Sequence, residues 1–405
     1  MKKILWYILL MVLALIGLTF CDTENLSPVV AEEMPSVAAD EIDSLAIVDP
    51  LLLPVIQDNK LIIQDTTLIQ DTHVTIEFLD KVSVEYTISD NGGGEITGTG
   101  ICLDTCRSPY HEKRNMVMNI SYSAPYDKDQ YHTLRQLTPG TKYYVRAWAI
   151  NNLGWGYGEE VMFTTPPLVT PRDVFNPDLQ YGSVSDIEGN VYATIQIGTQ
   201  IWMAENLKTT RYNNGSQIPV IIAANPDGVA LNTAACYWYN NDSRYKNSFG
   251  ALYNHYAVNA GNLCPTGWHV PDNEEWKKLE MTLGMTQAEA DVCGNFDSSS
   301  GHYIVPFRGT DQGTQMKATY TWRAWFDEGL WDMRDGNGTN TSGFSALPTG
   351  DVGWGNGASF YDSGDQTSWW CSGSPIVRTL STSSSKVGSG HYPKQLGINI
   401  RCLKD

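Results

Sequence analysis

Basic residues are scarce in this chain of 405 residues: 27 lysines and arginines stand against 45 aspartates and glutamates, giving a formal net charge of -18 at pH 7. Such an excess of negative charge repels the phosphate backbone of nucleic acids. We therefore expect no nucleic-acid partner. Charged residues make up only 18% of the chain and apolar residues 42%, which excludes a disordered or fibrous protein.

The sequence also lacks the usual signs of catalysis. No serine or cysteine in an elbow motif lies near His255 or His269, so nothing supports a nucleophilic triad. Glu274 and Glu275 are neighbouring acids at the start of a predicted helix, where helix capping explains them better than the paired carboxylates of a glycosidase. We expect no catalytic residue, no metal site and no cofactor.

The N-terminus has the plan of an export signal. Lys2 and Lys3 precede an uncharged, mostly apolar run over residues 4–20, which is typical of a secretory signal peptide. The run ends at Cys21, in a sequence that resembles a lipoprotein cleavage box. We expect residues 1–21 to be a lipoprotein signal peptide and Cys21 to be lipidated. An uncleaved membrane anchor is the alternative; in both cases the rest of the chain is exported.

A tether and a first domain follow. Residues 22–50 are rich in proline, alanine and acids and contain no aromatic residue, which predicts a flexible tether. From about residue 74, apolar residues recur at every second position, as in the strands of a β-sandwich. The sequence over 137–151 and 158–165 resembles the last strands of a fibronectin type III domain. We expect an all-β, fibronectin III-like sandwich over residues 51–167.

Cys102 and Cys106 lie in this first domain. A metal or redox pair is one explanation, but no second Cys/His pair at ligand spacing completes a zinc site. A small disulfide-closed loop and two unpaired thiols are the alternatives that stay open.

The clearest predicted helix lies in the last part of the chain. Asp272 and Glu275 have the spacing of a capping box that starts a helix at about residue 273. Apolar residues then recur at three- and four-residue steps: Trp276, Leu279 and Leu283. The sequence beyond Gly294 is rich in glycine, serine, asparagine and tryptophan with short strand-like stretches. This pattern predicts a loop-rich α+β domain.

The residues before that helix also carry a family resemblance. Over 264–276 the chain reads Cys-Pro-Thr-Gly-Trp-His-Val-Pro-Asp-Asn-Glu-Glu-Trp, and matching motifs lie at 186–192, 197–207, 343–350 and 401–405. In this order the motifs resemble the Fibrobacter succinogenes major paralogous (FISUMP) domain, a family of bacterial cell-surface lipoprotein modules. The family is more distantly similar to the C-type-lectin-like and formylglycine-generating-enzyme fold. The resemblance implies a FISUMP domain over 181–405, and the length of the chain favours separate domains with a linker over 168–180.

The resemblance further implies a disulfide between Cys264 and Cys402. In the related fold, the entry to the main helix and the end of the last strand come together. Export permits such a bond, and closing so long a loop stabilises a protein by roughly 4–5 kcal/mol on the chain-entropy model.

We expect a ligand to bind at an aromatic-rich stretch over 322–370. Exposed tryptophans beside carboxylates can stack on sugar faces and bond sugar hydroxyls. The alternative is that these tryptophans anchor long loops in the core. The expected ligand-binding residues are Trp325, Trp331, Trp354, Tyr361, Trp369, Trp370, Asp351 and Asp362.

Together these features predict an exported lipoprotein, anchored to the bacterial outer membrane by its lipid and displayed at the cell surface. We expect a non-catalytic binding or adhesion module that engages a glycan or a surface protein. Two alternatives stay open: a structural component of an envelope or adhesin assembly without a small ligand, and an enzyme acting on extracellular polysaccharide.

Overall fold

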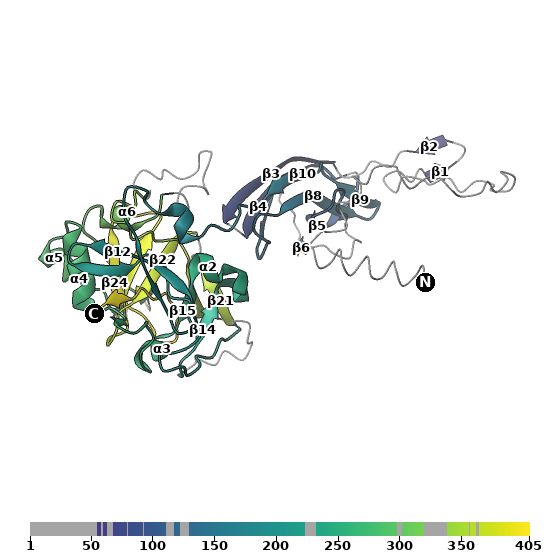
Figure 1. Cartoon of the computed structure of the whole chain (residues 1–405). Helices are drawn as coiled ribbons and strands as arrows, with labels where there is room; N and C mark the ends of the chain where they lie inside the picture. Colours follow the sequence, from purple (N-terminus) through teal and green to yellow (C-terminus); the bar gives the residue numbers. More distant parts are fainter. Residues whose placement is uncertain are drawn as a thin grey trace, which may run out of the picture. The chain divides into compact units, whose positions relative to one another are not determined.

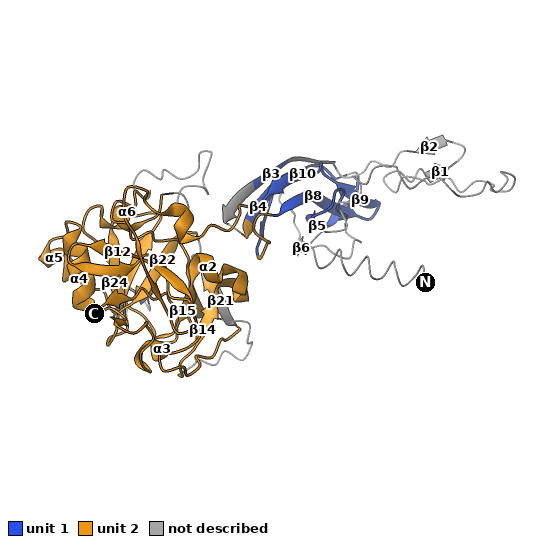
Figure 2. Ribbon diagram, in the orientation of Figure 1, with its two compact units in different colours: residues 1–75, 82–135, 141–165 blue, residues 76–81, 136–140, 166–405 orange. Residues whose placement is uncertain are grey.

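The chain divides into two compact units (Figure 2). The computed structural model describes residues 55–57, 60–62, 68–78, 80–91, 93–110, 117–121, 129–222, 232–297, 302–319, 338–355, 357–361 and 364–405. The first unit comprises residues 1–75, 82–135 and 141–165, and the second comprises residues 76–81, 136–140 and 166–405. Within the described ranges, no helix has the length and apolar character that crossing a membrane requires.

The first unit contains a β-sandwich (Figure 1). In its described part, one sheet has the strands β3 (Leu68–Phe78), β4 (Lys81–Asp90) and β7 (Asp129–Leu134). The other has β10 (Val161–Thr164), β8 (Lys142–Asn151), β5 (Ile96–Asp104) and β6 (Val117–Ser121) in that order, with β9 (Gly154–Tyr157) paired to β8. A hairpin of β1 (Val55–Gln57) and β2 (Lys60–Ile62) precedes them.

The period-two pattern accounts for this sandwich. Val84 and Tyr86 on β4 are buried, whereas Glu85 between them is exposed. A side-chain hydrogen bond joins the two sheets, since Thr99 Oγ1 on β5 donates to Gln130 Oε1 on β7 at 3.1 Å. The prediction of a β-sandwich is confirmed.

Short strands make up most of the regular structure in the second unit. One sheet has the order β11 (Gly182–Ser185), β12 (Val191–Ile197), β13 (Gln200–Met203), β25 (Leu403–Lys404) and β16 (Trp268–His269). Another has the order β19 (Phe307–Arg308), β24 (Val387–His391), β23 (Ile376–Ser381) and β22 (Gln366–Trp370). Three pairs complete the described strands: β14 (Cys236–Trp238) with β15 (Ala251–Tyr253), β17 (Phe296–Asp297) with β18 (His302–Tyr303), and β20 (Asp351–Gly355) with β21 (Gly357–Tyr361).

Helices in this unit are short. The described ones are η2 (Pro171–Val174), η3 (Tyr239–Asn241), η4 (Ser243–Tyr245), α2 (Lys246–Phe249), α3 (His255–Asn259), α4 (Asn273–Thr282), α5 (Gln287–Ala290) and α6 (Gln312–Met316). This mixture agrees with a loop-rich α+β domain. The relation to the C-type-lectin-like and formylglycine-generating-enzyme fold stays a prediction.

Helix α4 begins where its capping box predicts. The Glu275 backbone N donates to Asp272 Oδ1 at 2.8 Å, and the Asp272 backbone N donates to Glu275 Oε2 at 2.9 Å. Trp276 and Leu279 are fully buried. The helix is followed by Gly284 at φ 102°, a left-handed conformation that favours glycine.

An aromatic core lies against α4. The Trp276 ring is 4.8 Å from Trp202 and 6.0 Å from Trp369, and Phe344 lies 5.3 Å from Trp369, all measured between ring centroids. The guanidinium carbon of Arg401 is 4.3 Å from the centre of the Phe344 ring. A buried cation therefore packs against the face of this core.

Asn206 joins this cation to the core. Its Oδ1 accepts hydrogen bonds from Arg401 Nε at 2.7 Å and from Trp369 Nε1 at 2.9 Å. Its Nδ2 donates to the Phe249 carbonyl at 2.9 Å and to Asn399 Oδ1 at 3.0 Å. One amide thus satisfies polar groups from three separate parts of the chain.

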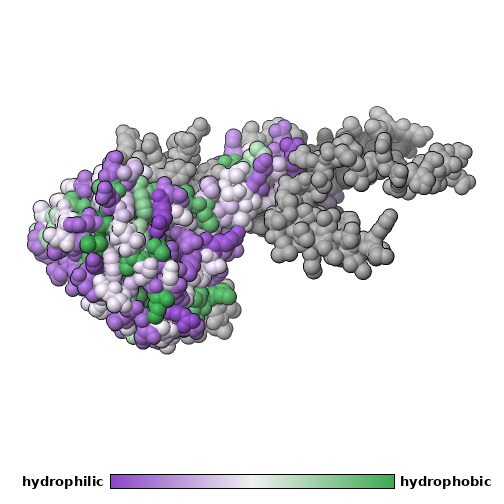
Figure 3. Space-filling view, in the orientation of Figure 1, coloured by the Kyte–Doolittle hydropathy of each residue, from purple (hydrophilic) through white to green (hydrophobic). Residues whose placement is uncertain are grey.

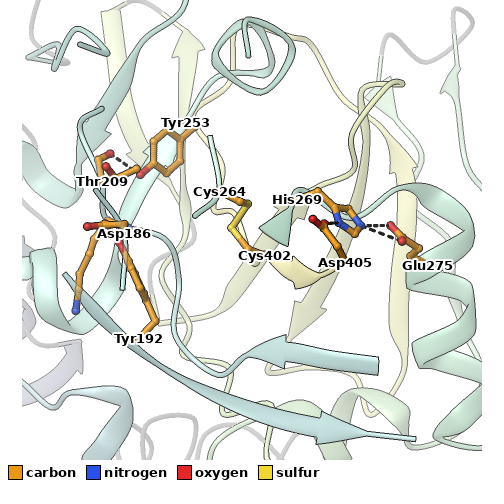
Figure 4. The surroundings of a disulfide bond; sticks show 10 residues. Asp186, Tyr192, Thr209, Tyr253, Cys264, His269, Glu275, Cys402 and Asp405 are labelled. Carbon is orange, nitrogen blue, oxygen red and sulfur yellow. Dashed lines mark hydrogen bonds and ion pairs between the residues drawn. A yellow bond between two sulfur atoms is a disulfide. The ribbon is translucent and has the colours of Figure 1, made fainter. Parts of the chain in front are cut away.

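The disulfide between Cys264 and Cys402 is present, with the two Cα atoms 5.9 Å apart across 138 positions of sequence. Figure 4 shows it between two groups of polar side chains: Asp186, Tyr192, Thr209 and Tyr253 on one side, and His269, Glu275 and Asp405 on the other. The bond ties the last strand to the segment that leads into α4.

We expect Asn206→Ala to lower the free energy of unfolding by about 3–5 kcal/mol, because it leaves the buried Arg401 Nε and Trp369 Nε1 without their shared acceptor. Urea unfolding followed by tryptophan fluorescence measures this loss. Asn214→Ala removes an exposed amide that accepts from the Ser216 backbone, and should cost less than about 1 kcal/mol. Equal losses in the two variants would contradict the role of Asn206.

Candidate functional site

The predicted ligand-binding stretch is only partly described. Trp325, Trp331 and Asp362 lie outside the described residues. Trp354 and Tyr361 belong to the hairpin of β20 and β21, but their side chains are also outside the described part. Asp351, the first residue of β20, is half-buried and pairs with Tyr361 in the strand register. For these six residues ligand binding stays a prediction.

Trp369 and Trp370 are core residues, and the prediction that they form an exposed platform is wrong. Both side chains are fully buried, on opposite faces of β22. Trp369 packs among Trp276 and its neighbours, whereas Trp370 lies 5.0 Å from the His255 ring and donates from Nε1 to the Tyr253 carbonyl at 2.8 Å. Because both faces of this strand are covered, neither ring face is open to a sugar.

The cysteine predictions have different outcomes. Cys21 lies outside the described residues, so its lipidation stays a prediction. Cys102 is a buried free thiol, whereas Cys106 is disulfide-bonded to a different cysteine, which excludes both a small loop closed by Cys102 and Cys106 and a pair of unpaired thiols. Burial raises the pKa of the Cys102 thiol to about 12, so the thiol stays protonated.

A cavity of about 500 Å³ lies elsewhere in the second unit, at residues that the sequence does not predict to form a site. Its lining residues come from η2, β11, β12 and the turn between η2 and β11: Arg172, Phe175, Tyr181, Gly182, Ser183, Val191 and Ala193. Two of these residues, Arg172 and Phe175, lie in the segment over 168–180, for which the sequence predicts a linker. The structure instead packs it against the second unit, with Val174 buried in the core.

Local hydrogen bonds give this segment a fixed shape. The Thr170 backbone N and Oγ1 both donate to Asp173 Oδ2, at 2.7 and 2.8 Å, at the start of η2. The rings of Phe175 and Tyr181 stack with centroids 4.2 Å apart, and the Tyr181 hydroxyl accepts from the Asn176 backbone N at 3.2 Å. Two half-buried aromatic rings are thereby held at the wall of the cavity.

Strands β11 and β12 contribute the remaining lining residues. Strand β11 is the edge strand of its sheet, and Gly182 and Ser183 on it are exposed. A Cβ atom at Gly182 would lie 2.7 Å from Thr194 Oγ1, so only glycine fits there without a shift. The Ser183 hydroxyl adds a hydrogen-bonding group to the lining.

The buried carboxylate of Glu205 pairs with Arg172 of the lining. The Glu205 side chain is only 5% exposed; it lies 3.3 Å from Arg172 Nε and 3.5 Å from Lys208 Nζ, and it accepts from the Ala193 backbone N at 3.1 Å. Burial lowers the pKa of Arg401 to about 9, and the charge of Glu205 opposes that shift, so Arg401 also lies within its field. Two cations therefore pair with one carboxylate, and this cluster has a net positive charge in a chain with a net charge of -18.

A second polar cluster lies beside the C-terminus (Figure 4). His269 Nδ1 is 2.6 Å from Asp405 Oδ1, and His269 Nε2 is 2.9 Å from Glu275 Oε1. Among the described residues, no group of three or more histidine, cysteine or acidic side chains has the arrangement to hold a metal ion. The cluster joins β16, α4 and the chain end, which is a structural role.

The residues that surround α4 and the disulfide also place the chain in a family. Residues 195–404 match the family model described as the Fibrobacter succinogenes major domain. The chain belongs to this family. The prediction of a FISUMP domain is confirmed. The cavity-lining residues precede the matched range, whereas Glu205 and Lys208 lie within it, so the site joins this domain to the segment before it.

Solved structures similar to this chain include fibronectin type III domains. The sixth such domain of human fibronectin type III domain containing protein 3 is 22% identical, with 25% of this chain and 87% of that chain covered, at a TM-score of 0.20. The FN1–FN3 domains of chicken CNTN1 are 16% identical, with 25% of this chain and 32% of that chain covered, also at 0.20. At this TM-score the likeness carries no argument about function. Among curated proteins, none matches the chain.

We expect His269→Gln to reduce stability more at pH 5.5 than at pH 8.5. Burial lowers the pKa of His269, but its hydrogen bonds with Asp405 and Glu275 outweigh burial and hold the pKa above its usual value. A raised folded-state pKa gives stabilisation that is complete below the unfolded-state pKa and is lost as pH rises through the folded-state value. Because the groups are partly exposed, the effect should stay below about 1 kcal/mol.

Urea unfolding of both proteins at the two pH values measures this difference. His391 lies on β24, in a different sheet from His269, and His391→Gln is the matched control. A loss at pH 8.5 that equals or exceeds the loss at pH 5.5 would contradict the ion-pair role of His269.

Proposed function

We propose that this protein is a non-catalytic binding module of the bacterial cell surface, and that its second unit binds a glycan in the cavity beside Arg172. The observation that carries the proposal is the lining itself: a stacked pair of aromatic rings, a guanidinium and a hydroxyl line one open cavity of about 500 Å³. This volume lies in the usual range for small-ligand sites, and such a combination suits a sugar, whose ring faces stack and whose hydroxyls hydrogen-bond.

The acids near the cavity favour binding over catalysis. A glycosidase needs two carboxylates on opposite sides of the bond that it cleaves. Asp173 accepts two hydrogen bonds from Thr170, and Glu205 is buried beside Arg172 and Lys208. Each has a structural duty, which supports the proposal that the site holds a ligand without transforming it.

Apolar residues are scattered over the face of the second unit that Figure 3 draws. On the face drawn in Figure 3, hydrophilic and hydrophobic residues of the second unit alternate in small areas. Monomeric proteins normally scatter apolar residues in this way, whereas large contiguous apolar areas mark protein-binding surfaces. This distribution favours a small ligand in a cavity over a broad protein interface on that face.

The proposal also places the protein outside the inner membrane. The sequence order of Lys2, Lys3, an apolar run and Cys21 supports export, cleavage and attachment of lipid to the cysteine, and thereby anchoring to the outer membrane. The net charge of -18 supports the absence of a nucleic-acid partner.

Mass spectrometry of the exported protein should find an N-terminal Cys21 carrying acyl chains, and the protein should partition into detergent. The matched variant is Cys21→Ala, which removes the thiol that accepts the lipid. It should be released from the membrane or keep its signal sequence. An intact Met1 in the wild-type protein, or cleavage beyond Cys21, would contradict the lipid anchor.

We expect the whole exported chain to bind immobilised glycans, and Tyr181→Ala to weaken that binding at least tenfold, because the variant removes a stacking ring from the wall. A glycan array followed by calorimetry of the best ligand measures both. Tyr181→Phe keeps the ring and loses only the hydroxyl that accepts from Asn176, so its affinity should stay close to wild type.

Thermal unfolding of each variant shows whether weaker binding results from the loss of a ligand contact or from the loss of the fold. Absence of binding to every glycan would contradict the proposed function and favour a purely structural or protein-binding role. Glycan binding that is unchanged in a folded Tyr181→Ala variant would place the ligand outside this cavity.

A further inference from the structure

The charge around the cavity is unlike that of the whole chain. Arg172 and Lys208 both pair with Glu205, so this cluster of two cations and one carboxylate has a net positive charge although the chain carries -18. Lys208 is buried. Its charge is fixed by the fold and acts on the cavity through a medium that screens it less than water does.

Arg172 is the charged residue of this cluster that lines the cavity. Its side chain is 57% exposed and lines the cavity, whereas Glu205 behind it is 5% exposed. Its ion pair with Glu205 is made through Nε. A guanidinium has five N–H donors in a planar fork, so the terminal nitrogens can donate to a second anion while Nε keeps its partner.

We infer that the glycan bound in this cavity is acidic, with the carboxylate of a uronic acid against Arg172 and the sugar ring against Tyr181 and Phe175. This inference rests on the proposed function. A carboxylate has the planar geometry that the guanidinium fork pairs with, and the outer face of the stacked Phe175–Tyr181 pair supplies the stacking surface that a sugar requires.

The same charges argue against a densely charged polymer. One exposed guanidinium can pair with one anionic group, while the remaining surface of a chain with 45 acidic and 27 basic residues repels further negative charge. The favoured ligand therefore has isolated carboxylates that alternate with neutral sugar surface, or a single acidic residue at its end.

Calorimetric titration of the whole exported chain tests the inference with two pairs of probes: oligomers of galacturonic and glucuronic acid, and the methyl esters of the same oligomers. The ester keeps the shape and removes the charge. We expect at least one acid to bind about tenfold to a hundredfold more tightly than its ester, the range typical of a hydrogen bond to a charged group.

Arg172→Gln should lower the affinity for the acid to that for the ester and leave the ester unaffected. Arg172→Lys, which keeps the charge but loses the fork, should fall between the two. Arg244→Gln is the control, because Arg244 is similarly exposed at 54% and forms a comparable ion pair with Asp242 away from the lining. It should bind both probes like the wild-type protein.

Equal affinity of the wild-type protein for acid and ester would overturn the inference, as would binding of neither. Preference for the acid that survives in a folded Arg172→Gln variant would overturn it too. The proposed function fails separately: it falls if no glycan of any charge binds, and it stands if neutral glycans bind in a manner that depends on Tyr181.

Discussion

The second unit depends on a buried guanidinium that has no carboxylate as a hydrogen-bond partner among the described residues. Arg401 donates to Asn206 Oδ1 at 2.7 Å, to the Met203 carbonyl at 3.2 Å and to the Phe344 carbonyl, and it lies over the Phe344 ring. An unsatisfied buried charge would cost several kcal/mol. The end of β13, the loop at Phe344 and the last strand segment must therefore all be in place before this cation is stable.

This requirement connects the core to the cavity. Arg401 lies in the field of the buried Glu205, and Glu205 in turn is paired with Lys208 and with the exposed Arg172. A series of alternating charges thus runs from the centre of the unit to the lining. Glu205 also accepts from the Ala193 backbone on β12, so the position of the surface guanidinium is tied to the sheet. A site supported in this way is held by the fold and needs little ordering when a ligand arrives.

The features that depend on residues close together in the sequence could be predicted from it. The period-two alternation predicted the β-sandwich, and the spacing of Asp272 and Glu275 predicted the start of α4, because both features depend on neighbours in the sequence. The disulfide followed from the family resemblance. The burial of Trp369 and Trp370 agrees with the alternative that the tryptophans anchor the core. The sequence could not decide between the two, since a strand covered on both faces has no alternation to show it. The cavity was missed because Arg172 and Glu205 meet only through the fold.

The central claim is that the cavity beside Arg172 is a ligand site. A crystal structure of the whole exported chain soaked with an oligogalacturonate or oligoglucuronate tests it most directly. The account predicts electron density for one sugar ring against Tyr181 and Phe175, with its carboxylate within hydrogen-bonding distance of the Arg172 guanidinium. A sugar bound instead at the hairpin of β20 and β21, with the Arg172 cavity empty, would contradict it.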